Sequence, residues 1–278
     1  MSITPQLNFP QGMLAGQTAI ITGAAQGIGA ETAVILAREG CKIVIADLDA
    51  EKARKTAETI NSSGGSAIVV AGDITNNEYL IHLVQRTVEF GEGKIHIIIN
   101  NAGYAWDSPI ENIQDKQWET IISLHNTAPF KLIRAAAPYF MLKDSEPRSI
   151  VNISSTSGIY GNAGQASYAL AKAGLVGLTK TLAHEWGPEY GVRVNTVAFG
   201  AIKTRLTQAP KGEFVVRPDG TKHAVGFKGG YDEEDKWVGD IPLRRIGSPT
   251  DAGRAILAVV SPLFSYVTGQ VAGGRGGM

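Results

Sequence analysis

The sequence predicts an α/β protein built on a single Rossmann-like, doubly wound parallel sheet of about seven strands flanked by helices. Short apolar runs rich in Val, Ile and Ala alternate along the chain with longer segments that have helical periodicity. The apolar runs are nearly continuous, which is typical of parallel strands buried on both faces. Strands and helices that alternate in this way form parallel sheets with right-handed crossovers. Because the 278 residues contain no linker and no internal repeat, we expect one domain over residues 1–278.

The expected elements follow from these runs in chain order. We expect strands at 18–22, 42–46, 67–71, 95–100, 149–153, 193–197 and 267–271. We expect helices at 28–39, 50–62, 79–90, 118–140, 166–190 and 250–260. One segment, 206–240, departs from the alternation because it is rich in Gly and charge and has consecutive acidic residues at 232–235. Stretches of this length are usually functional lids or disordered, so we expect an inserted substrate lid, with an incidental solvated insertion as the alternative.

The composition argues against several classes of protein. The chain is 44% hydrophobic and 19% charged, and its 26 basic residues balance its 26 acidic ones, which disfavours a nucleic-acid partner. The single cysteine, Cys41, excludes an intrachain disulfide framework and suits a reducing compartment. No apolar run approaches the ~20 residues of a membrane span, and no signal-peptide pattern is present. We therefore expect a soluble cytoplasmic protein with no membrane partner. No metal site is expected, because metal-ligand spacing is missing among His82, His96, His125, His184 and His223.

A glycine motif lies between the first expected strand and the first expected helix. Residues 22–29 read Thr-Gly-Ala-Ala-Gln-Gly-Ile-Gly. Gly23 permits a tight turn, and Gly27 and Gly29 let the backbone approach a phosphate and let helix and strand pack closely. The helix N-terminus adds free N–H groups and the positive end of its dipole. The motif therefore predicts a site for the pyrophosphate of a dinucleotide.

An acidic residue, Asp47, ends the second expected strand. It follows the glycines by about 20 residues, where a carboxylate can bind the adenosine ribose hydroxyls and repel a 2′-phosphate. No Arg or Lys lies inside the glycine motif or directly after Asp47. These observations predict NAD(H) rather than NADP(H) as the cofactor. The alternative is that Asp47, like nearby Asp49, is only a surface acid at a strand end.

A tyrosine and a lysine, Tyr168 and Lys172, lie one turn apart on one face of the expected helix 166–190. A lysine ammonium beside a phenol should lower the pKa of the phenol from its usual value of about 10, which suits a general acid or base. The chain has a second pair with this spacing, Tyr139 and Lys143. Only the first pair is preceded by a hydroxyl at the end of a strand, that of Ser155 just past 149–153. The carboxyl ends of parallel strands are where such sheets bind ligands.

Together these motifs resemble those of the short-chain dehydrogenase/reductase family. The resemblance covers residues 16–277 and includes Asn-Asn-Ala-Gly at 100–103, Asn-Ile-Ser-Ser at 152–155 and the stretch 200–204. It implies that Tyr168 exchanges a proton with the substrate oxygen and that Ser155 hydrogen-bonds that oxygen. It also implies that Lys172 binds the nicotinamide ribose and tunes Tyr168, and that Asn126 holds a water that relays the proton. His125 should point away from Asn126, and no role is assigned to it.

The resemblance also implies the remaining contacts and the assembly. The expected cofactor-binding residues are Gly23, Gln26, Gly27, Ile28, Gly29, Asp47, Leu48, Asp73, Ile74, Asn100, Ala102, Gly103, Tyr168, Lys172, Gly200, Ile202 and Thr204. The expected substrate contacts are Ser155, Tyr168, Trp106 and Tyr160. Two positions depart from the family pattern: Phe199 replaces a proline before Gly200, and Arg275 replaces an acid near the C-terminus. A homotetramer, or else a homodimer, is expected.

The substrate is less sharply indicated than the reaction. The aromatic candidates and the expected lid favour a hydrophobic secondary alcohol or its ketone, including cyclic or aromatic ones. The first alternative is a 3-oxoacyl-(acyl-carrier-protein)-type reductase, which would usually favour NADPH and need a basic patch that Lys131, Arg134 and Lys180 do not obviously form. The second is a sugar or polyol dehydrogenase with a more polar pocket. A non-catalytic NAD-binding sensor is the fourth reading, although such a protein should lack the tyrosine, lysine or serine.

Overall fold

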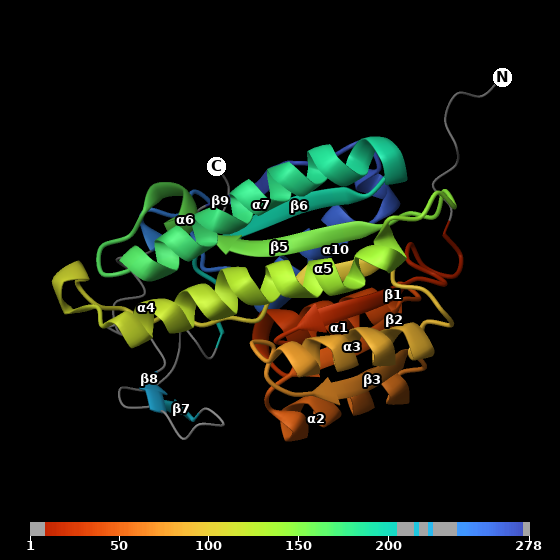
Figure 1. Ribbon diagram of the computed structural model, residues 1–278, viewed down its shortest axis with the longest axis horizontal. Coiled ribbons are helices and arrows are strands. Elements are labelled where there is room, and N and C mark those ends of the chain that lie inside the picture. The colour runs from red at the N-terminus through yellow and green to blue at the C-terminus, as the bar shows by residue number, and fades with distance from the viewer. Residues whose placement is uncertain (1–8, 205–213, 217–221, 225–237, 275–278) are drawn as a thin grey trace.

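The computed structural model describes residues 9–204, 214–216, 222–224 and 238–274. Seven parallel strands form one sheet in the order β3-β2-β1-β4-β5-β6-β9, which confirms the predicted fold class (Figure 1). The strands are β1 (Thr18–Thr22), β2 (Lys42–Asp47), β3 (Ser66–Ala71), β4 (Ile97–Asn100), β5 (Ser149–Ser155), β6 (Arg193–Phe199) and β9 (Val271–Gly274). A separate antiparallel pair, β7 (Phe214–Val216) and β8 (Lys222–Ala224), lies within the segment 206–240.

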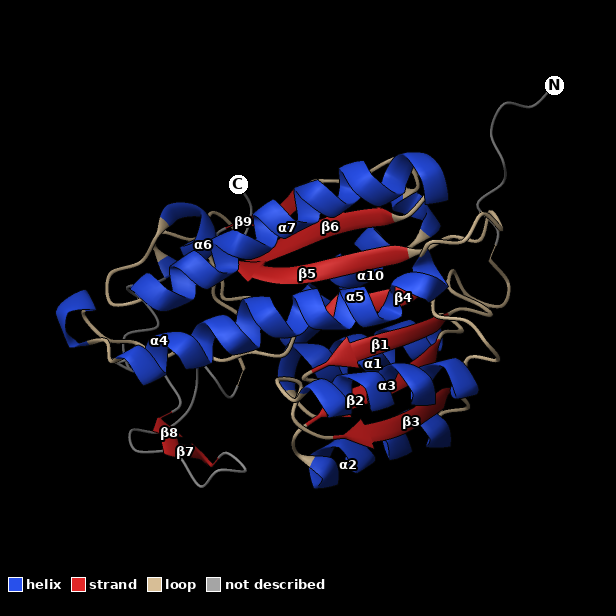
Figure 2. Ribbon diagram, viewed as in Figure 1, coloured by secondary structure: helices blue, strands red, loops and turns tan. Residues whose placement is uncertain are grey.

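Helices cover both faces of the sheet (Figure 2). The longer helices are α1 (Gly27–Arg38), α2 (Ala50–Ser62), α3 (Asn77–Phe90), α4 (Asp115–Ile122), α5 (Ala128–Phe140), α7 (Ala166–Tyr190) and α10 (Pro249–Val260). The shorter ones are η1 (Ile110–Asn112), the π-helical turn η2 (Ser123–Thr127), α6 (Thr156–Tyr160) and η3 (Pro262–Phe264). Among the described residues, no helix is both long and apolar enough to cross a membrane.

The apolar strand residues divide between two cores, one on each face of the sheet. In β1, Ala19 and Ile21 belong to one buried cluster together with residues of α1, α2 and α10. Ile20, between them, belongs to the other cluster with residues of α3, α5 and α7. Successive side chains of a strand point to opposite faces, so a strand covered on both sides must be apolar throughout. This explains why the strands read as continuous apolar runs.

The order of the strands fixes where a ligand can bind. From β1 the chain first adds β2 and β3 on one side and then returns to add β4, β5, β6 and β9 on the other. The direction therefore reverses between β1 and β4. In open α/β sheets the crevice outside the carboxyl ends of the strands at such a reversal is the usual ligand site.

The main differences from the sequence prediction concern the last strand, the helix 118–140 and α6, and several other elements differ by one or two residues at an end. The last strand is Val271–Gly274 rather than 267–271, because residues 267–270 form a turn in which Gly269 has a left-handed φ of +72°. The expected helix 118–140 begins at Asp115 and is interrupted by the π turn η2. Helix α6 was not expected. Most of the predicted lid, 206–240, lies outside the described residues, as does Arg275.

Candidate active site

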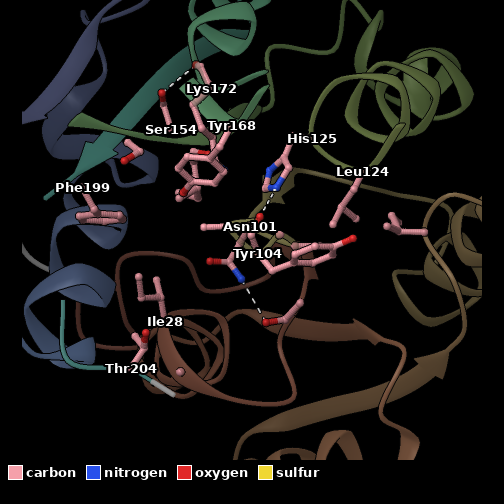
Figure 3. A pocket seen from close by; sticks show the side chains of 18 of the residues that line it. Ile28, Asn101, Tyr104, Leu124, His125, Ser154, Tyr168, Lys172, Phe199 and Thr204 are labelled. Atoms are coloured by element: carbon pink, nitrogen blue, oxygen red, sulfur yellow. Dashed lines mark hydrogen bonds between the residues drawn. The ribbon is translucent and has the colours of Figure 1, made fainter. Parts of the chain in front are cut away.

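A cavity of about 360 Å³ opens at the carboxyl ends of β1, β2, β4, β5 and β6, at the point of reversal. Two groups of elements line it. The glycine turn and the ends of β2 and β3 form one group, and residues of η2, β5 and α7 form the other. The predicted site residues that line it are Gly23, Gln26, Gly27, Ile28, Asp47, Leu48, Asp73, Ile74, Ala102, Gly103, Ser155, Tyr168, Lys172, Gly200, Ile202 and Thr204. Figure 3 shows part of this cavity with Tyr168, Lys172 and His125 around it.

The glycine turn has the geometry of an anion cradle. Gly23 and Gly27 have left-handed φ angles of +66° and +61°, which favour glycine. A Cβ on Gly23 would lie 2.8 Å from the Cα of Ala102, so the turn and the end of β4 approach too closely for a side chain. Gln26 precedes α1 without capping it, which leaves the first N–H groups of the helix available at the cavity. These groups and the helix dipole can hold a pyrophosphate.

The carboxylate of Asp47 is fixed at the end of β2. One oxygen accepts a hydrogen bond from the backbone N–H of Ala25 at 2.9 Å, and the other accepts one from the N–H of Asp49 at 3.0 Å. Asp73 lines the same part of the cavity. Burial, and then the charges of Asp47 and Asp73, raise the pKa of the neighbouring Tyr79 phenol. Among the described residues that line the cavity, Lys172 is the only cationic side chain.

The proton-transfer candidates converge in the other part of the cavity. Ser155 ends β5, and its hydroxyl oxygen accepts a hydrogen bond from the N–H of Ser157 at 3.2 Å, which caps α6. Lys172 is only 4% exposed; its ammonium donates to the carbonyl oxygen of Ile153 at 2.7 Å and lies 5.6 Å from the centre of the Tyr168 ring. Tyr168 therefore has the ammonium of Lys172 near its ring, and its phenol forms a hydrogen bond with the side chain of Ser155.

The pKa values of the two α7 residues shift in ways that burial explains. Burial raises the pKa of Tyr168 to about 12, opposed by a hydrogen bond with Ser155. Burial lowers the pKa of Lys172 to about 7. The expected lowering of the Tyr168 pKa is therefore not found, because desolvation of the phenolate outweighs the nearby groups that favour it.

Comparison with known proteins then identifies the family. A family model described as enoyl-(acyl carrier protein) reductase matches residues 23–278. The chain belongs to the short-chain dehydrogenase/reductase family. It is therefore an oxidoreductase that binds a nicotinamide cofactor, and the glycine turn and the uncapped start of α1 fit such a group.

Relatives in this short-chain dehydrogenase/reductase family align over nearly their whole length. The chain is 33% identical to the 3-oxoacyl-(acyl-carrier-protein) reductase FabG of Thermotoga maritima, over 95% of this chain and 98% of that protein. It is 34% identical to a 3-oxoacyl-(acyl-carrier-protein) reductase of Synechocystis, with the same coverage. The crystal structure of a dehydrogenase/reductase from Sinorhizobium meliloti 1021 superposes with a TM-score of 0.81 at 29% identity, covering 95% of each chain.

Several residues that the family resemblance placed in the site do not line the cavity. The side chain of Asn126 faces α7, where its Nδ2 donates to the carbonyl oxygen of Ala171 at 2.8 Å. Asn100 is buried and donates to Asn152 at 2.8 Å, which joins β4 to β5. Gly29 lies behind the turn, where a Cβ would be 2.2 Å from the oxygen of Gly23. Trp106 is half-buried away from the lining, and Tyr160 is 49% exposed at the end of α6.

Several other lining residues were not predicted from the family pattern, whereas Asn101 belongs to the stretch 100–103 that the family pattern placed along the cofactor. His125, Tyr104 and Leu124 line the cavity where Asn126 and Trp106 were expected. Asn101 braces the glycine turn, because its Nδ2 donates to the oxygens of Thr22 and Gly23 at 2.9 and 3.0 Å. Phe199, the residue that replaces a proline, both lines the cavity and packs against the core. Only the position of His125 beside the predicted Asn126 could have drawn attention to it. Among the described residues, no group of His, Cys, Asp or Glu could hold a metal ion.

The burial of Lys172 leads to a prediction about stability. Because the pKa of Lys172 is lowered from 10.5 to about 7 on folding, the unfolded chain holds the extra proton between these pH values. The free energy of unfolding therefore rises with pH across this window, and the charged lysine destabilises the fold most below about pH 7. We expect the Lys172→Met variant to be more stable than the native protein near pH 6, with a difference that shrinks toward pH 10.

Urea denaturation at both ends of this pH range measures the difference. Lys180→Met, on the exposed side of the same helix, is the control and should show no such pH-dependent gain. A Lys172→Met variant that is less stable than the native protein at low pH would mean that the ammonium is net stabilising where it lies.

Proposed function

We propose that the protein interconverts 3-oxoacyl and 3-hydroxyacyl thioesters with NAD(H). The observation that carries this proposal is the convergence of Ser155, Tyr168 and Lys172 at one cavity, in a chain 33–34% identical to 3-oxoacyl-(acyl-carrier-protein) reductases over 95% of its length. The sequence alone favoured a hydrophobic secondary alcohol and placed the thioester second. The relatives support the thioester better, and they reverse that order.

The chain's own groups can move one proton to or from a substrate oxygen. In the reductive direction Tyr168 donates its phenol proton to this oxygen, and the hydroxyl of Ser155 donates a hydrogen bond to it as charge develops. The ammonium of Lys172 favours the phenolate that remains on Tyr168. When bound, the nicotinamide ring supplies or accepts the hydride. The protein's task is to hold the reacting groups in line and to exclude water from them.

The preference for NAD(H) rests on charge. The carboxylates of Asp47 and Asp73 line the part of the cavity next to the glycine turn, and the only described cation of the lining, Lys172, lies beside Tyr168. A 2′-phosphate near Asp47 would meet a negative charge with no described cationic side chain of the lining on that side to neutralise it. Ribose hydroxyls, in contrast, can donate hydrogen bonds to that carboxylate.

A hydrophobic ketone without a thioester is the second candidate. Leu124, Ala105 and Phe199 give the cavity apolar walls close to the proton-transfer residues, which suits a cyclic or aromatic substrate. Such walls would equally accept an acyl chain, so this observation alone does not separate the two classes. The hypothesis of a sugar or polyol dehydrogenase has less support, because such an enzyme needs a polar cavity lining near the proton-transfer residues.

One assay separates the candidates. Initial rates are followed at the reduced-nicotinamide absorbance band, with NADH and then NADPH. The substrates are a 3-oxoacyl thioester, the matching ketone in which a CH2 group replaces the sulfur, and a set of cyclic and aromatic ketones. We expect NADH-linked turnover of the thioester with a higher kcat/KM than its carbon analogue. Equal rates on the pair, or turnover of cyclic ketones alone, would favour the second candidate, and binding of NADH without any turnover would indicate a sensor.

The assembly stays a prediction. Phe130 on α5 and Leu170 on α7 are 46% and 51% exposed, and apolar side chains of this size on the surface are consistent with the expected homotetramer or homodimer. The single-domain organisation over residues 1–278 also stays a prediction.

A further inference from the structure

His96 joins two strands at the amino end of the sheet, opposite the cavity. It directly precedes β4 and is only 4% exposed. Its backbone N–H donates to the carbonyl oxygen of Thr18, the first residue of β1, at 3.0 Å. In return, the backbone N–H of Thr18 donates to Nδ1 of the His96 ring, also at 3.0 Å. The imidazole therefore takes the place of a backbone carbonyl and extends the β1–β4 ladder, whose regular part has only three residue pairs.

The two hydrogen bonds of the ring fix its protonation state. A backbone N–H can only donate, so Nδ1 of His96 must be an acceptor without a hydrogen. Nε2 lies 3.0 Å from Oε2 of Glu146, and a carboxylate only accepts, so Nε2 carries the hydrogen. An imidazole with one hydrogen on Nε2 is neutral. The contact with β1 therefore requires a neutral ring.

Charged groups from two segments surround this ring. Glu146 and Arg148 belong to the segment between α5 and β5, and Lys94 lies just before His96 and pairs with Glu146. Arg148 is buried and donates to both oxygens of Asp144 at 2.6 and 2.7 Å, which holds that segment in place. Burial lowers the pKa of His96 below its usual 6.5; Glu146 opposes this shift, and the charges of Arg148 and Lys94 add to it. The surroundings thus favour the neutral ring.

We propose that His96 is a pH-sensitive clasp, which ties the amino end of β1 to β4 while its ring is neutral and releases β1 when Nδ1 is protonated. A protonated Nδ1 would be a donor that faces another donor, the N–H of Thr18, a residue only 1% exposed. A buried N–H without an acceptor is unfavourable, so the junction should open. The proposal does not depend on the proposed function, because His96 has no part in the reaction.

The carboxyl end of the same two strands has a tie that does not titrate. There the hydroxyl oxygen of Thr22 accepts from the backbone N–H groups of Asn101 and Ala102, each at 3.0 Å. The side-chain amide of Asn101 also donates to the carbonyl oxygens of Thr22 and Gly23. Hydroxyl and amide groups keep their charge over the pH range in which histidine titrates. Acid should therefore loosen β1 from its amino end, whereas the glycine turn at the other end keeps its bracing.

Two substitutions separate the hydrogen-bond acceptor from the titrating ring. His96→Asn places an amide oxygen near the Nδ1 site, where it can accept from Thr18 but cannot be protonated. His96→Gln places its amide near the Nε2 site, where it can bind Glu146 but leaves the N–H of Thr18 without its acceptor. His184→Asn changes an exposed histidine of α7 and is the control.

Thermal unfolding at pH 7.5 and pH 5.5 gives the first readout. The pKa of histidine in an unfolded chain is about 6.5, so this change in pH should raise the unfolding equilibrium constant of the native protein by up to about 10-fold. The Tm should fall by about 3 to 6 °C for this reason. His96→Asn should lack this part of the fall, and His184→Asn should retain it. His96→Gln should have a lower Tm than the native protein already at pH 7.5. A pH dependence that is the same in His96→Asn and in the native protein would overturn the proposal.

Hydrogen exchange followed by mass spectrometry locates the opening. The native protein is exchanged at both pH values, the data are corrected for intrinsic exchange rates, and overlapping peptides that cover the two ends of β1 and β4 are compared. We expect extra exchange at pH 5.5 around Thr18, no extra exchange around Thr22 and Asn101, and loss of the acid effect in His96→Asn. Equal extra exchange at both ends would contradict a clasp at the amino end. Exchange around Thr18 that does not respond to pH would also overturn the proposal, and that result needs only the native protein.

Discussion

Replacing Tyr168 by phenylalanine is expected to reduce turnover by about 10²- to 10⁴-fold, the usual range for loss of a general acid or base. The cofactor should still bind, because the glycine turn and Asp47 lie in another part of the cavity. The edge contact between the ring and His125 is also kept, so the fold should be unaffected. Initial rates with NADH and a fluorescence titration of NADH binding measure the two quantities separately.

The chain supplies its own control for this experiment. Tyr139 and Lys143 repeat the same spacing in the sequence, but Lys143 pairs with Glu189 at 2.6 Å on the surface, and Tyr139, which belongs to α5, packs against the core. Tyr139→Phe should therefore leave turnover unchanged. If the Tyr168→Phe and Tyr139→Phe variants have the same turnover, Tyr168 is not the proton donor, and the proposed reaction has no general acid.

Replacing Asp47 by asparagine is expected to narrow the preference for NAD over NADP by about 10- to 100-fold, since a hydrogen bond to a charged group contributes about 1.5–3 kcal/mol. Asparagine keeps the shape and one acceptor oxygen, so the N–H group of Ala25 or that of Asp49 retains a partner. The change is therefore mainly one of charge. Dissociation constants for both cofactors give the result.

A neighbouring acid provides the matched control. Asp49 is the N-cap of α2 and pairs with Lys52, and it does not line the cavity. Asp49→Asn removes a charge from the same stretch of chain and should leave the cofactor preference as it is. An unchanged preference in Asp47→Asn would mean that the discrimination lies elsewhere, for example in residues outside the described part of the chain.

The parts of the fold that the sequence predicted well are those in which one local pattern decides. β1 was placed at its observed ends because five consecutive buried residues precede a glycine turn. The last strand was misplaced because Val267 and Val271 give equally good apolar ends, and only the turn at Gly269 separates them. That turn depends on contacts with Asn195 in a distant strand, which no local pattern records.

The candidate site also contains features that one local pattern predicts and features that depend on contacts between distant elements. The glycine turn and the pair Tyr168 and Lys172 could be predicted from spacing, because each is a short continuous pattern: the first joins β1 to α1, and the second lies within α7. Spacing could not predict that His125 lines the cavity in place of Asn126, because a π turn rotates side chains away from the positions that helical periodicity predicts. The rise in the pKa of Tyr168 could not be predicted from spacing either, because desolvation of the phenol depends on how many elements pack around it.

The pairing of β6 with β9 bears on how the chain is made. The edge of the sheet beside β6 is closed by Val271–Gly274, at the far end of the sequence, and Arg193 also donates to the carbonyl oxygens of Val259 and Val260 at 2.8 Å. During synthesis β6 therefore has one unpaired edge until residues 271–274 have also been made. Such long-range parallel pairing forms slowly and leaves an unpaired strand exposed to other chains in the meantime. Truncation of even a few residues of β9 should make the nascent protein prone to aggregation, although every described residue that lines the cavity precedes β9 in the sequence.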